Sequence, residues 1–236
     1  MSRYILLWLE GPLQAWGYDS LFGVRSTLDF PTKSGVLGMI LAALGMSGPQ
    51  EELLRTLSKG EQTVFSFKKS NRVSASTMVD FHMVGNGYDS NDAWENLNIP
   101  KKRDGTKATG AGSSAGSKIT YRHYLQDAVF AVVAEIPEEL SSAVESAFSE
   151  PVWPLCLGRR CCVPSKLIYR GSYSSLETAA GQALSISDSY GYKLDFKAVE
   201  GQYPDEGEVL VLRDVPLSFG EHKKYESRYV TLIKEI

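Results

Sequence analysis

One stretch, residues 22–45, combines a turn signal, a helix start and a nearly continuous apolar run, and it constrains the fold most. Pro31 biases the residue before it toward extended backbone, so a helix is expected to begin no earlier than Thr32. Thr32 and Ser34 are both suitable N-caps, and Gly45 stands where a helix commonly ends on a left-handed glycine. The apolar side chains in this stretch predict a helix that packs into the core; they are Val36, Leu37, Met39, Ile40, Leu41 and Leu44.

The start of this helix would bring free backbone N–H groups, the positive end of the helix dipole and the Lys33 ammonium to one point. That combination is typical of a phosphate site. Gly35 and Gly38 lower helix propensity, which indicates that something approaches this face closely. The alternative is an ordinary core helix with a lysine in its first turn. A nucleotide-binding P-loop is excluded, because its glycines precede the lysine, whereas here Gly35 follows it.

A chain of 236 residues is long enough for one large domain or two small ones with ample core. No run approaches the ~18 consecutive apolar residues of a membrane span, and the opening MSRYILLWLEGP is typical of a first strand rather than a signal peptide. The three cysteines, two of them adjacent, lack the spacing of a disulfide framework or a zinc site. We therefore expect a cytoplasmic protein with reduced thiols, no metal, no other cofactor and no membrane contact.

The net charge of −3 gives no global sign of nucleic-acid binding, but two segments are locally basic. Residues 101–123 carry six lysines and arginines against a single acid, Asp104, and residues 151–176 carry four and no acid. A mildly acidic protein with such segments can still bind a polyanion locally. The alternative interpretation is that these are solvated side chains on loops.

Hydrophobic patterns along the chain predict a mixture of strands and helices. Strands are expected at residues 3–9, 63–67, 72–83, the second half of 119–136, 192–199, 208–213, 215–219 and 229–233, and further helices at 50–58 and 138–148. The Ser- and Gly-rich stretch between Tyr169 and Tyr192 is predicted to be a loop. Residues 85–118 are small, polar and basic at their centre, so the strands on either side are expected to form a long hairpin with a mobile tip.

The order of these elements predicts an α+β protein. Residues 1–150 follow a β-α-β-hairpin-β-α order, which is that of ferredoxin-like or RRM-like domains, on which single-stranded RNA is often read. Residues 151–236 are expected to form a small C-terminal β-rich domain. The hairpin is interpreted as an insertion in the first domain, and its basic tip suits an arm that orders on nucleic acid.

Several short motifs occur together in a characteristic order. They are GPLQAWG from Gly11, RST from Arg25, FPTKSGVLG from Phe30, DFH from Asp80, YLQDA from Tyr124, PLCLGRRC from Pro154 and SR from Ser227. In this order and spacing they resemble the CasD family, the subunit of the type I-E CRISPR Cascade complex that holds the 5′ end of the guide RNA. The resemblance covers nearly the whole chain.

The resemblance implies an RRM-like palm, a thumb hairpin over roughly residues 76–123 and a small C-terminal β-sheet domain. It implies a non-catalytic, RNA-binding subunit in antiviral defence that caps the 5′ handle of the guide RNA. The implied partners are a CasC-type backbone subunit, a CasA-type large subunit and, indirectly through the complex, target DNA. The residues implied at the RNA are Arg25, Ser26, Lys33, Ser34, Gly35, His82, Lys101, Lys102, Arg103, Arg159 and Arg160.

Some of these assignments have alternatives. Trp16 and Gln14 could stack on and hydrogen-bond a handle nucleotide, or Trp16 could anchor the core after the first strand. His82 is either a hydrogen-bonded core histidine or an RNA contact at the base of the hairpin. Because adjacent side chains point differently, one of Arg159 and Arg160 is expected at a phosphate and the other at a partner protein.

Two other classes of function compete with guide-RNA capping. The first is a metal-independent endoribonuclease that cuts CRISPR repeat RNA. Relatives in the type I-C branch resemble enzymes of this kind. Its catalytic residues would be Tyr121, His123 and Lys118, with the histidine as general acid or base on a ribose 2′-OH. The second is a scaffold whose basic segments meet acidic protein surfaces without touching RNA.

Overall fold

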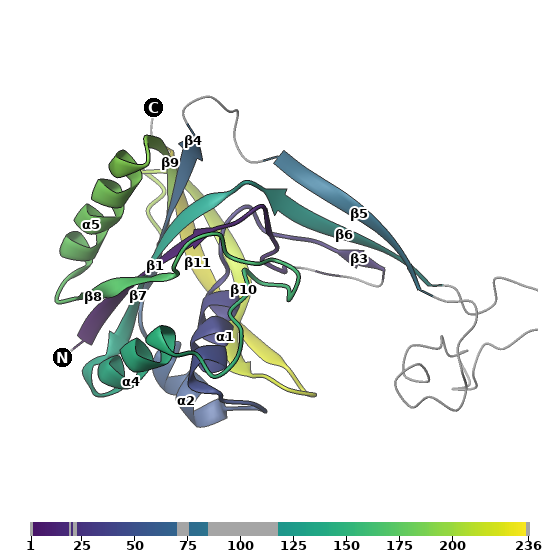
Figure 1. Cartoon of the computed structure of the whole chain (residues 1–236), viewed down its shortest axis with the longest axis horizontal. Coiled ribbons are helices and arrows are strands. Elements are labelled where there is room, and N and C mark those ends of the chain that lie inside the picture. The colour runs from purple at the N-terminus through teal and green to yellow at the C-terminus, as the bar shows by residue number, and fades with distance from the viewer. Residues whose placement is uncertain (1, 19, 21–22, 70–75, 85–117, 235–236) are drawn as a thin grey trace, which may run out of the picture.

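The computed structural model describes residues 2–18, 20, 23–69, 76–84 and 118–234. Its main element is a seven-stranded sheet with helices on both faces (Figure 1). The strands lie in the order β10-β11-β9-β4-β7-β1-β8, and each neighbouring pair is antiparallel. They are β1 (Ser2–Glu10), β4 (Gln62–Lys69), β7 (Val129–Pro137), β8 (Tyr169–Tyr173), β9 (Tyr192–Glu200), β10 (Glu208–Ser218) and β11 (Lys224–Lys234).

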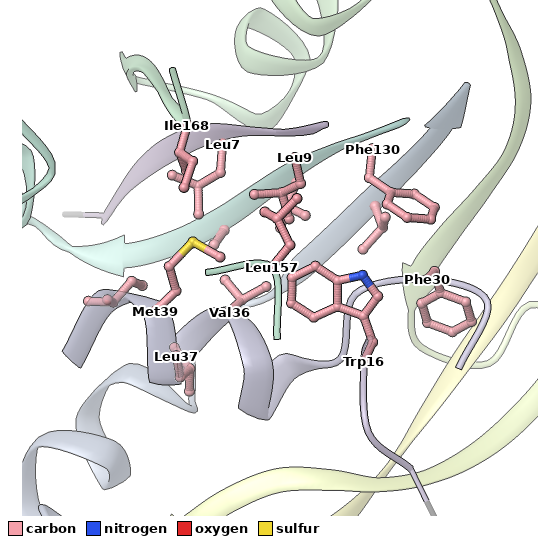
Figure 2. Packing of buried hydrophobic residues seen from close by; sticks show 14 of the residues in the cluster. Leu7, Leu9, Trp16, Phe30, Val36, Leu37, Met39, Phe130, Leu157 and Ile168 are labelled. Carbon is pink, nitrogen blue, oxygen red and sulfur yellow. The ribbon is translucent and has the colours of Figure 1, made fainter. Parts of the chain in front are cut away.

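The central strands β1 and β7 carry continuous apolar runs, as expected for strands that are covered on both faces. Ile5, Leu7 and Leu9 of β1 belong to the core beneath α1 (Lys33–Leu44), α2 (Glu51–Leu57) and α4 (Glu138–Ser149). Leu6 and Trp8 of the same strand belong to a second core beneath α5 (Leu176–Ser189). In Figure 2, side chains of α1 point toward those of β1 in the first core.

The helix predicted in residues 22–45 is α1; of the two predicted N-caps Thr32 is the one used, and the predicted end at Gly45 is confirmed. The hydroxyl of Thr32 accepts the backbone N–H of Gly35 at 3.2 Å, and Gly45 ends the helix with a φ of 71°. Five of the six side chains predicted to face the core are buried, and the sixth, Leu44, is partly buried against it. No helix among the described residues is long and apolar enough to cross a membrane.

The strands after residue 151 do not form a sheet of their own. β8 pairs with β1 at one edge, so β1-α1-β4-β7-α4-β8 follow a β-α-β-β-α-β order within the large sheet. β9 pairs with β4, and β11 and β10 extend that side of the sheet. The expected boundary near residue 151 therefore does not separate two sheets.

The stretch between Tyr169 and Tyr192 was expected to be a loop, and this prediction is wrong. It contains β8 and α5, and the hydroxyl of Ser175 caps α5 by accepting the backbone N–H of Thr178 at 3.2 Å. Ala179 and Ala183, four residues apart on one face, are fully buried against the sheet. Small side chains let this helix lie close to the strands, but they also give it the composition of a loop.

A second, small sheet extends away from the large one (Figure 1). β5 (Ser76–Val84) pairs antiparallel with β6 (Lys118–Gln126), β3 (Val24–Arg25) runs parallel to β6, and β2 (Leu13–Gln14) pairs with the base of β6. The flanking strands of the expected hairpin therefore pair. Its tip, including the predicted RNA residues Lys101, Lys102 and Arg103, lies outside the described residues.

Candidate nucleic-acid interface

One face of the small sheet carries basic side chains. Arg25 of β3 is in register with Arg122 of β6, and Asp80 of β5 stands opposite Arg122. Residues in register on neighbouring strands share a face, and so do residues two apart on one strand. His82 is two residues after Asp80 on β5, so it lies on this face too. The His82 ring nitrogen Nδ1 is 3.7 Å from a carboxylate oxygen of Asp80. The sequence-predicted residues Arg25 and His82 are thus brought together, and Arg122 joins them.

A tight turn delivers two more arginines to this region. Leu157 and Cys162 are fully buried and close the turn, because the N–H of Leu157 donates to the carbonyl of Cys162 at 2.8 Å. The N–H of Ala15 donates to the carbonyl of Leu157 at 3.0 Å and fixes the turn to the body of the protein. Gly158 has a φ of 92°, and a Cβ there would collide with the carbonyl oxygen of Ala15. Only glycine fits this position, and Arg159 follows it at the tip of the turn.

Arg159 fastens this turn to the small sheet. Its Nη1 donates to the carbonyl of His123 at 3.1 Å and its Nη2 to the carbonyl of Arg25 at 2.9 Å. The guanidinium carbon lies 4.6 Å from the centre of the Tyr124 ring, a cation–π geometry. These contacts with the backbone of β6 and β3 make Arg159 a clamp between two parts of the interface.

Arg160 differs from Arg159 in exposure and in contacts. Its side chain is exposed, and within the part of the chain described here its guanidinium forms no hydrogen bond or ion pair with a protein group. One of the two arginines was expected at a phosphate and the other at a partner protein, but Arg159 instead bonds to backbone carbonyls of its own chain. Arg160 is therefore the member of the pair that is open to an external phosphate.

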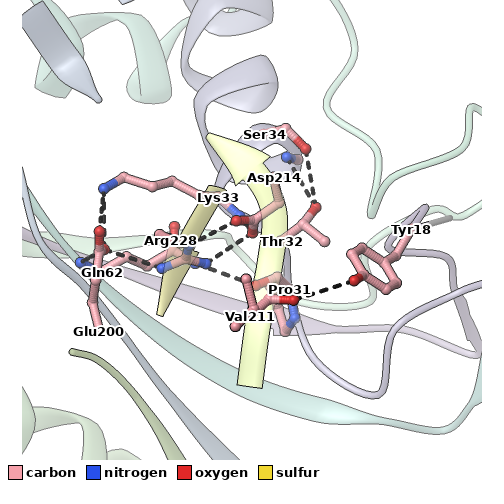
Figure 3. A network of polar contacts seen from close by, with 11 residues as sticks. Tyr18, Pro31, Thr32, Lys33, Ser34, Gln62, Glu200, Val211, Asp214 and Arg228 are labelled. Atoms are coloured by element: carbon pink, nitrogen blue, oxygen red, sulfur yellow. Dashed lines mark hydrogen bonds and ion pairs between the residues drawn. The ribbon is translucent and has the colours of Figure 1, made fainter. Parts of the chain in front are cut away.

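Lys33 does not lie on this surface. It is 2% exposed, and its Nζ is 2.9 Å from a carboxylate oxygen of Glu200 (Figure 3). Its backbone N–H, at the start of α1, donates to Asp214 at 2.7 Å, and Arg228 joins Asp214 and Glu200 through bonds of 2.7 to 3.0 Å. Burial lowers the pKa of Lys33, and the Glu200 carboxylate opposes that effect. The predicted phosphate contact of Lys33 is wrong, because protein carboxylates occupy the helix start.

Two neighbours of Lys33, Ser34 and Gly35, are partly buried and have close contacts within the protein. The Ser34 hydroxyl lies 3.4 Å from that of Thr32, so it helps to cap α1. A Cβ on Gly35 would press on the Trp16 ring, which is the close approach that the glycine indicated. The expected RNA contacts of Ser34 and Gly35 therefore have no support from the geometry.

Trp16 and Gln14 are buried and cannot stack on or bond a nucleotide as the protein stands. The Nε2 of Gln14 donates to the carbonyls of Leu9 and Ala128 at 3.1 and 2.7 Å, and its Oε1 accepts the Trp16 Nε1–H at 3.1 Å. Both side chains are at most 1% exposed. Of the two alternatives for Trp16, the structure has the core anchor, and the proposed base contact of Gln14 is wrong.

The residues of the alternative endoribonuclease site lie elsewhere on the small sheet. Tyr121 and His123 are two residues apart on β6, so they share the face opposite Arg25 and Arg122. The side chain of Lys118 lies outside the described residues. Within the described part of the chain, no group of three or more histidines, cysteines or carboxylates could hold a metal ion.

The resulting surface combines the basic face of the small sheet with the Arg159–Arg160 turn. Arg25 and Arg122 lie in register on this face with Asp80 opposite Arg122, and Arg159 of the turn, followed by the exposed Arg160, donates to the carbonyl of Arg25. Guanidinium groups are suited to bind phosphate oxygens through paired hydrogen bonds. Arg122 was not predicted as a site residue, because the local sequence does not indicate that it pairs with Arg25 of another strand.

The chain is similar to CRISPR-associated proteins over nearly its whole length. The CRISPR system Cascade subunit CasD of Escherichia coli (strain K12) is 29% identical over 214 residues, which are 84% of this chain and 88% of that protein. A chain of a CRISPR RNA-guided surveillance complex matches 98% of this chain and 89% of its own, with a TM-score of 0.71 and 27% identity. A solved Cas protein with 24% identity and a TM-score of 0.62 has the same fold. Because the family model described as CRISPR-associated protein (Cas_Cas5) matches residues 4–231, the chain belongs to the Cas5 family of CRISPR-associated proteins.

Proposed function

We propose that this chain is a non-catalytic subunit of a type I-E Cascade surveillance complex that binds and caps the 5′ handle of the guide RNA in antiviral defence. The observation that carries the proposal is the cluster of arginines where the Arg159–Arg160 turn meets the small sheet. The names of the Escherichia coli relative and of the similar surveillance complex support it. The proposed partners are the guide RNA, a CasC-type backbone subunit and a CasA-type large subunit, with target DNA reached through the complex.

In this proposal each part of the fold has a role. The β1-α1-β4-β7-α4-β8 unit serves as a ferredoxin-like, RRM-like palm, and the β5–β6 hairpin serves as the thumb. Phosphates of the handle bind Arg160, Arg25 and Arg122, which fixes the register of the RNA without reading its bases. Arg159 holds the turn against the thumb so that the other three guanidinium groups keep one spacing.

The arrangement of charge favours a single-stranded RNA over a folded acidic protein as the partner of this face. The guanidinium groups come from separate elements, β3, β6 and the 157–162 turn, and so they follow a path rather than form one point. A phosphate backbone offers regularly spaced charges along such a path, and a positive groove is the usual device for binding single strands. His82 at the edge of the path adds a hydrogen-bonding group for a splayed base or a phosphate.

The test uses the purified full-length chain, without divalent metal, and two labelled RNAs: a 5′-handle RNA and a complete repeat RNA. We expect the chain to bind the handle, to leave the repeat intact, and to lose at least tenfold in affinity when Arg25 and Arg160 are both changed to glutamine. The matched control changes two arginines remote from this face, Arg55 of α2 and Arg213 of β10, to glutamine. Equal loss in the control, or no handle binding by the parent, would refute the proposal.

The same experiment separates the proposal from the enzyme alternative. A discrete cut within the repeat that disappears in His123→Ala would assign the chain to the endoribonucleases and make the region of Tyr121 the active site. An intact repeat bound through its handle supports capping. Ultraviolet crosslinking of the bound RNA then distinguishes direct contact from a scaffold role, because a scaffold would give no crosslinked peptide from β3, β6 or the 157–162 turn.

A further inference from the structure

Three free thiols lie in and beside the Arg159–Arg160 turn, and they differ in exposure. Cys161 is exposed, Cys156 is partly buried and Cys162 is fully buried. Reactive cysteines are exposed and have cations nearby, whereas structural cysteines buried in apolar surroundings are inert. Cys161 directly follows the two arginines and is exposed, so it meets both conditions. It is the thiol of this turn that an oxidant in solution reaches first.

A second thiol, that of Cys156, lies against the backbone of Cys161. The Cys156 Sγ donates to the carbonyl oxygen of Arg160 at 3.4 Å. That carbonyl belongs to the peptide bond that joins Arg160 to Cys161, so the Cys156 sulfur lies beside the residue that carries the exposed thiol. Burial raises the pKa of Cys156, the Arg160 cation opposes that effect, and the Cys161 thiol adds to it. The two thiols are therefore close enough to interact electrostatically.

We propose that Cys161 and Cys156 form an oxidation site: a peroxide oxidises Cys161, Cys156 then closes a disulfide with it, and the oxidised turn binds RNA less tightly. In the first step the Cys161 sulfur attacks a peroxide oxygen, the O–O bond breaks, and a sulfenic acid and water form. In the second step the Cys156 sulfur attacks the Cys161 sulfur, loses its proton, and the hydroxyl leaves as water. Two thiols and one hydrogen peroxide thus give one disulfide and two waters. Only the effect on RNA rests on the proposed function.

Cys162 is a poorer partner for the sulfenic acid, although it is adjacent to Cys161. Its side chain is fully buried, and its backbone N–H and carbonyl are held by hydrogen bonds of 2.8 Å to Arg159 and Leu157. Burial also raises the pKa of Cys162 to about 12, so near neutral pH it has almost no thiolate to attack another sulfur. Cys156 is less buried and therefore remains the resolving thiol.

The disulfide changes contacts that now position the turn. The Cys161 sulfur lies 3.6 Å from the hydroxyl of Tyr124, and the Arg159 guanidinium lies over the same ring. A disulfide brings its two sulfur atoms to about 2.0 Å, so at least one of them gives up its present contact. Cys156 also loses the S–H that donates to the carbonyl of Arg160. The backbone that carries Arg160 is therefore repositioned relative to the basic face of the small sheet.

The bridge is expected to be reversible. It spans only residues 156–161, and closing so short a loop constrains the unfolded chain little. Exposed disulfides that add little stability are the labile ones, and a thiol reductant opens them again.

The first test treats the purified, reduced full-length chain with a slight molar excess of hydrogen peroxide, alkylates the remaining thiols and digests the monomer with trypsin without reduction. Cleavage after Arg159 and Arg160 separates Cys156 from the two adjacent cysteines. We expect mass spectrometry to find peptide 123–159 joined to peptide 161–166. A bridge inside peptide 161–166, a covalent dimer as the main product, or no bridge would overturn the inference.

Three variants assign the bridge to its two sulfur atoms. Cys162→Ala should still form it, and circular dichroism checks that this variant is folded. Cys161→Ser, at an exposed position, should not form it. In Cys156→Ser the sulfenic acid at Cys161 has no partner, so the trapping reagent dimedone should label that residue. A bridge that persists in Cys161→Ser, or dimedone labelling of Cys162 in place of Cys161, would contradict the assignment.

The effect on RNA is measured as the ratio of handle-RNA affinities before and after peroxide treatment. We expect the parent to bind at least tenfold more weakly once the bridge has formed and to recover with dithiothreitol, whereas Cys161→Ser should change less than twofold. Unchanged affinity of the bridged parent, or an equal loss in Cys161→Ser, would overturn this effect. If the reduced parent does not bind handle RNA, the proposed function fails, and the peptide map still decides whether the oxidation site exists.

Discussion

The ammonium group of Lys33 lies 2.9 Å from a carboxylate oxygen of Glu200, beneath the first turn of α1. The contact joins two segments 167 residues apart and belongs to a network with Asp214 and Arg228. Two cations therefore face two carboxylates inside the protein, and the network ties the start of α1 to β9, β10 and β11. The motif that most suggested a phosphate site is thus part of the internal structure.

We expect Lys33→Met to destabilise the protein, because it leaves the carboxylate of Glu200 with one cation fewer in a largely buried site. Removing one partner of a buried ion pair typically lowers the free energy of unfolding by about 3 kcal/mol. Urea unfolding followed by circular dichroism measures the change, and Lys193→Met, at an exposed position of β9, is the matched control. Under conditions where Lys33→Met remains folded, its handle-RNA affinity should match the parent. Unchanged stability with lost affinity would restore the phosphate role.

Gly158→Ala should destabilise the protein and disturb RNA binding, because the new Cβ would meet the carbonyl oxygen of Ala15. Gly191→Ala separates this collision from backbone strain, since Gly191 has a φ of 69° but no atom within 4 Å of an added Cβ. A left-handed alanine alone costs about 1 kcal/mol, and overpacking adds about 2 kcal/mol, so Gly158→Ala should cost ~3 kcal/mol and Gly191→Ala ~1 kcal/mol. Equal losses in the two variants would mean that the turn moves freely away from Ala15.

Arg159 and Arg160 should differ in what their substitution changes. Arg160→Gln should leave the melting temperature unchanged, weaken handle-RNA binding, and reduce the slope of log affinity against log salt by about 0.7, the value for one lost phosphate contact on a single strand. Arg159→Gln should lower the free energy of unfolding by about 2 kcal/mol, because it removes two charge-assisted hydrogen bonds and the contact with the Tyr124 ring. If Arg160→Gln destabilises the fold and Arg159→Gln does not, the roles are reversed.

Sequence patterns within a single segment were sufficient to predict several helices and strands. The Thr32 cap, the apolar run and Gly45 together predict α1, and the alternating residues near Val64 predict β4. The helix α5 was missed because its buried face consists of small residues, Ala179, Ala183 and Ser187, although the Ser175 cap and the Ala179–Ala183 spacing were usable signals.

The site was harder to predict than the fold because its geometry depends on contacts between distant segments. A lysine in a first helical turn has the same local sequence whether it faces solvent or Glu200, 167 residues away. In the same way, nothing near Arg159 indicates that the backbone carbonyls of His123 and Arg25 accept its hydrogen bonds. Residue type and local charge indicated the region of the interface. Only the packing distinguishes Arg159, which bonds to the backbone of the small sheet, from the exposed Arg160.

The buried thiol of Cys162 should make the protein less stable as the pH rises above 9. Burial raises the pKa of Cys162 to about 12, whereas an unfolded thiol has a pKa of 9.0. Between these values the unfolded chain releases a proton that the folded protein retains, so the free energy of unfolding falls with increasing pH. The contribution of one such group is at most about 1.4 kcal/mol per pH unit. Urea unfolding at pH 8, 9 and 10 with reductant measures the slope, and Cys162→Ala should flatten it. An unchanged slope in that variant would assign the loss to Tyr169 and Tyr192, whose pKa values burial raises to about 12.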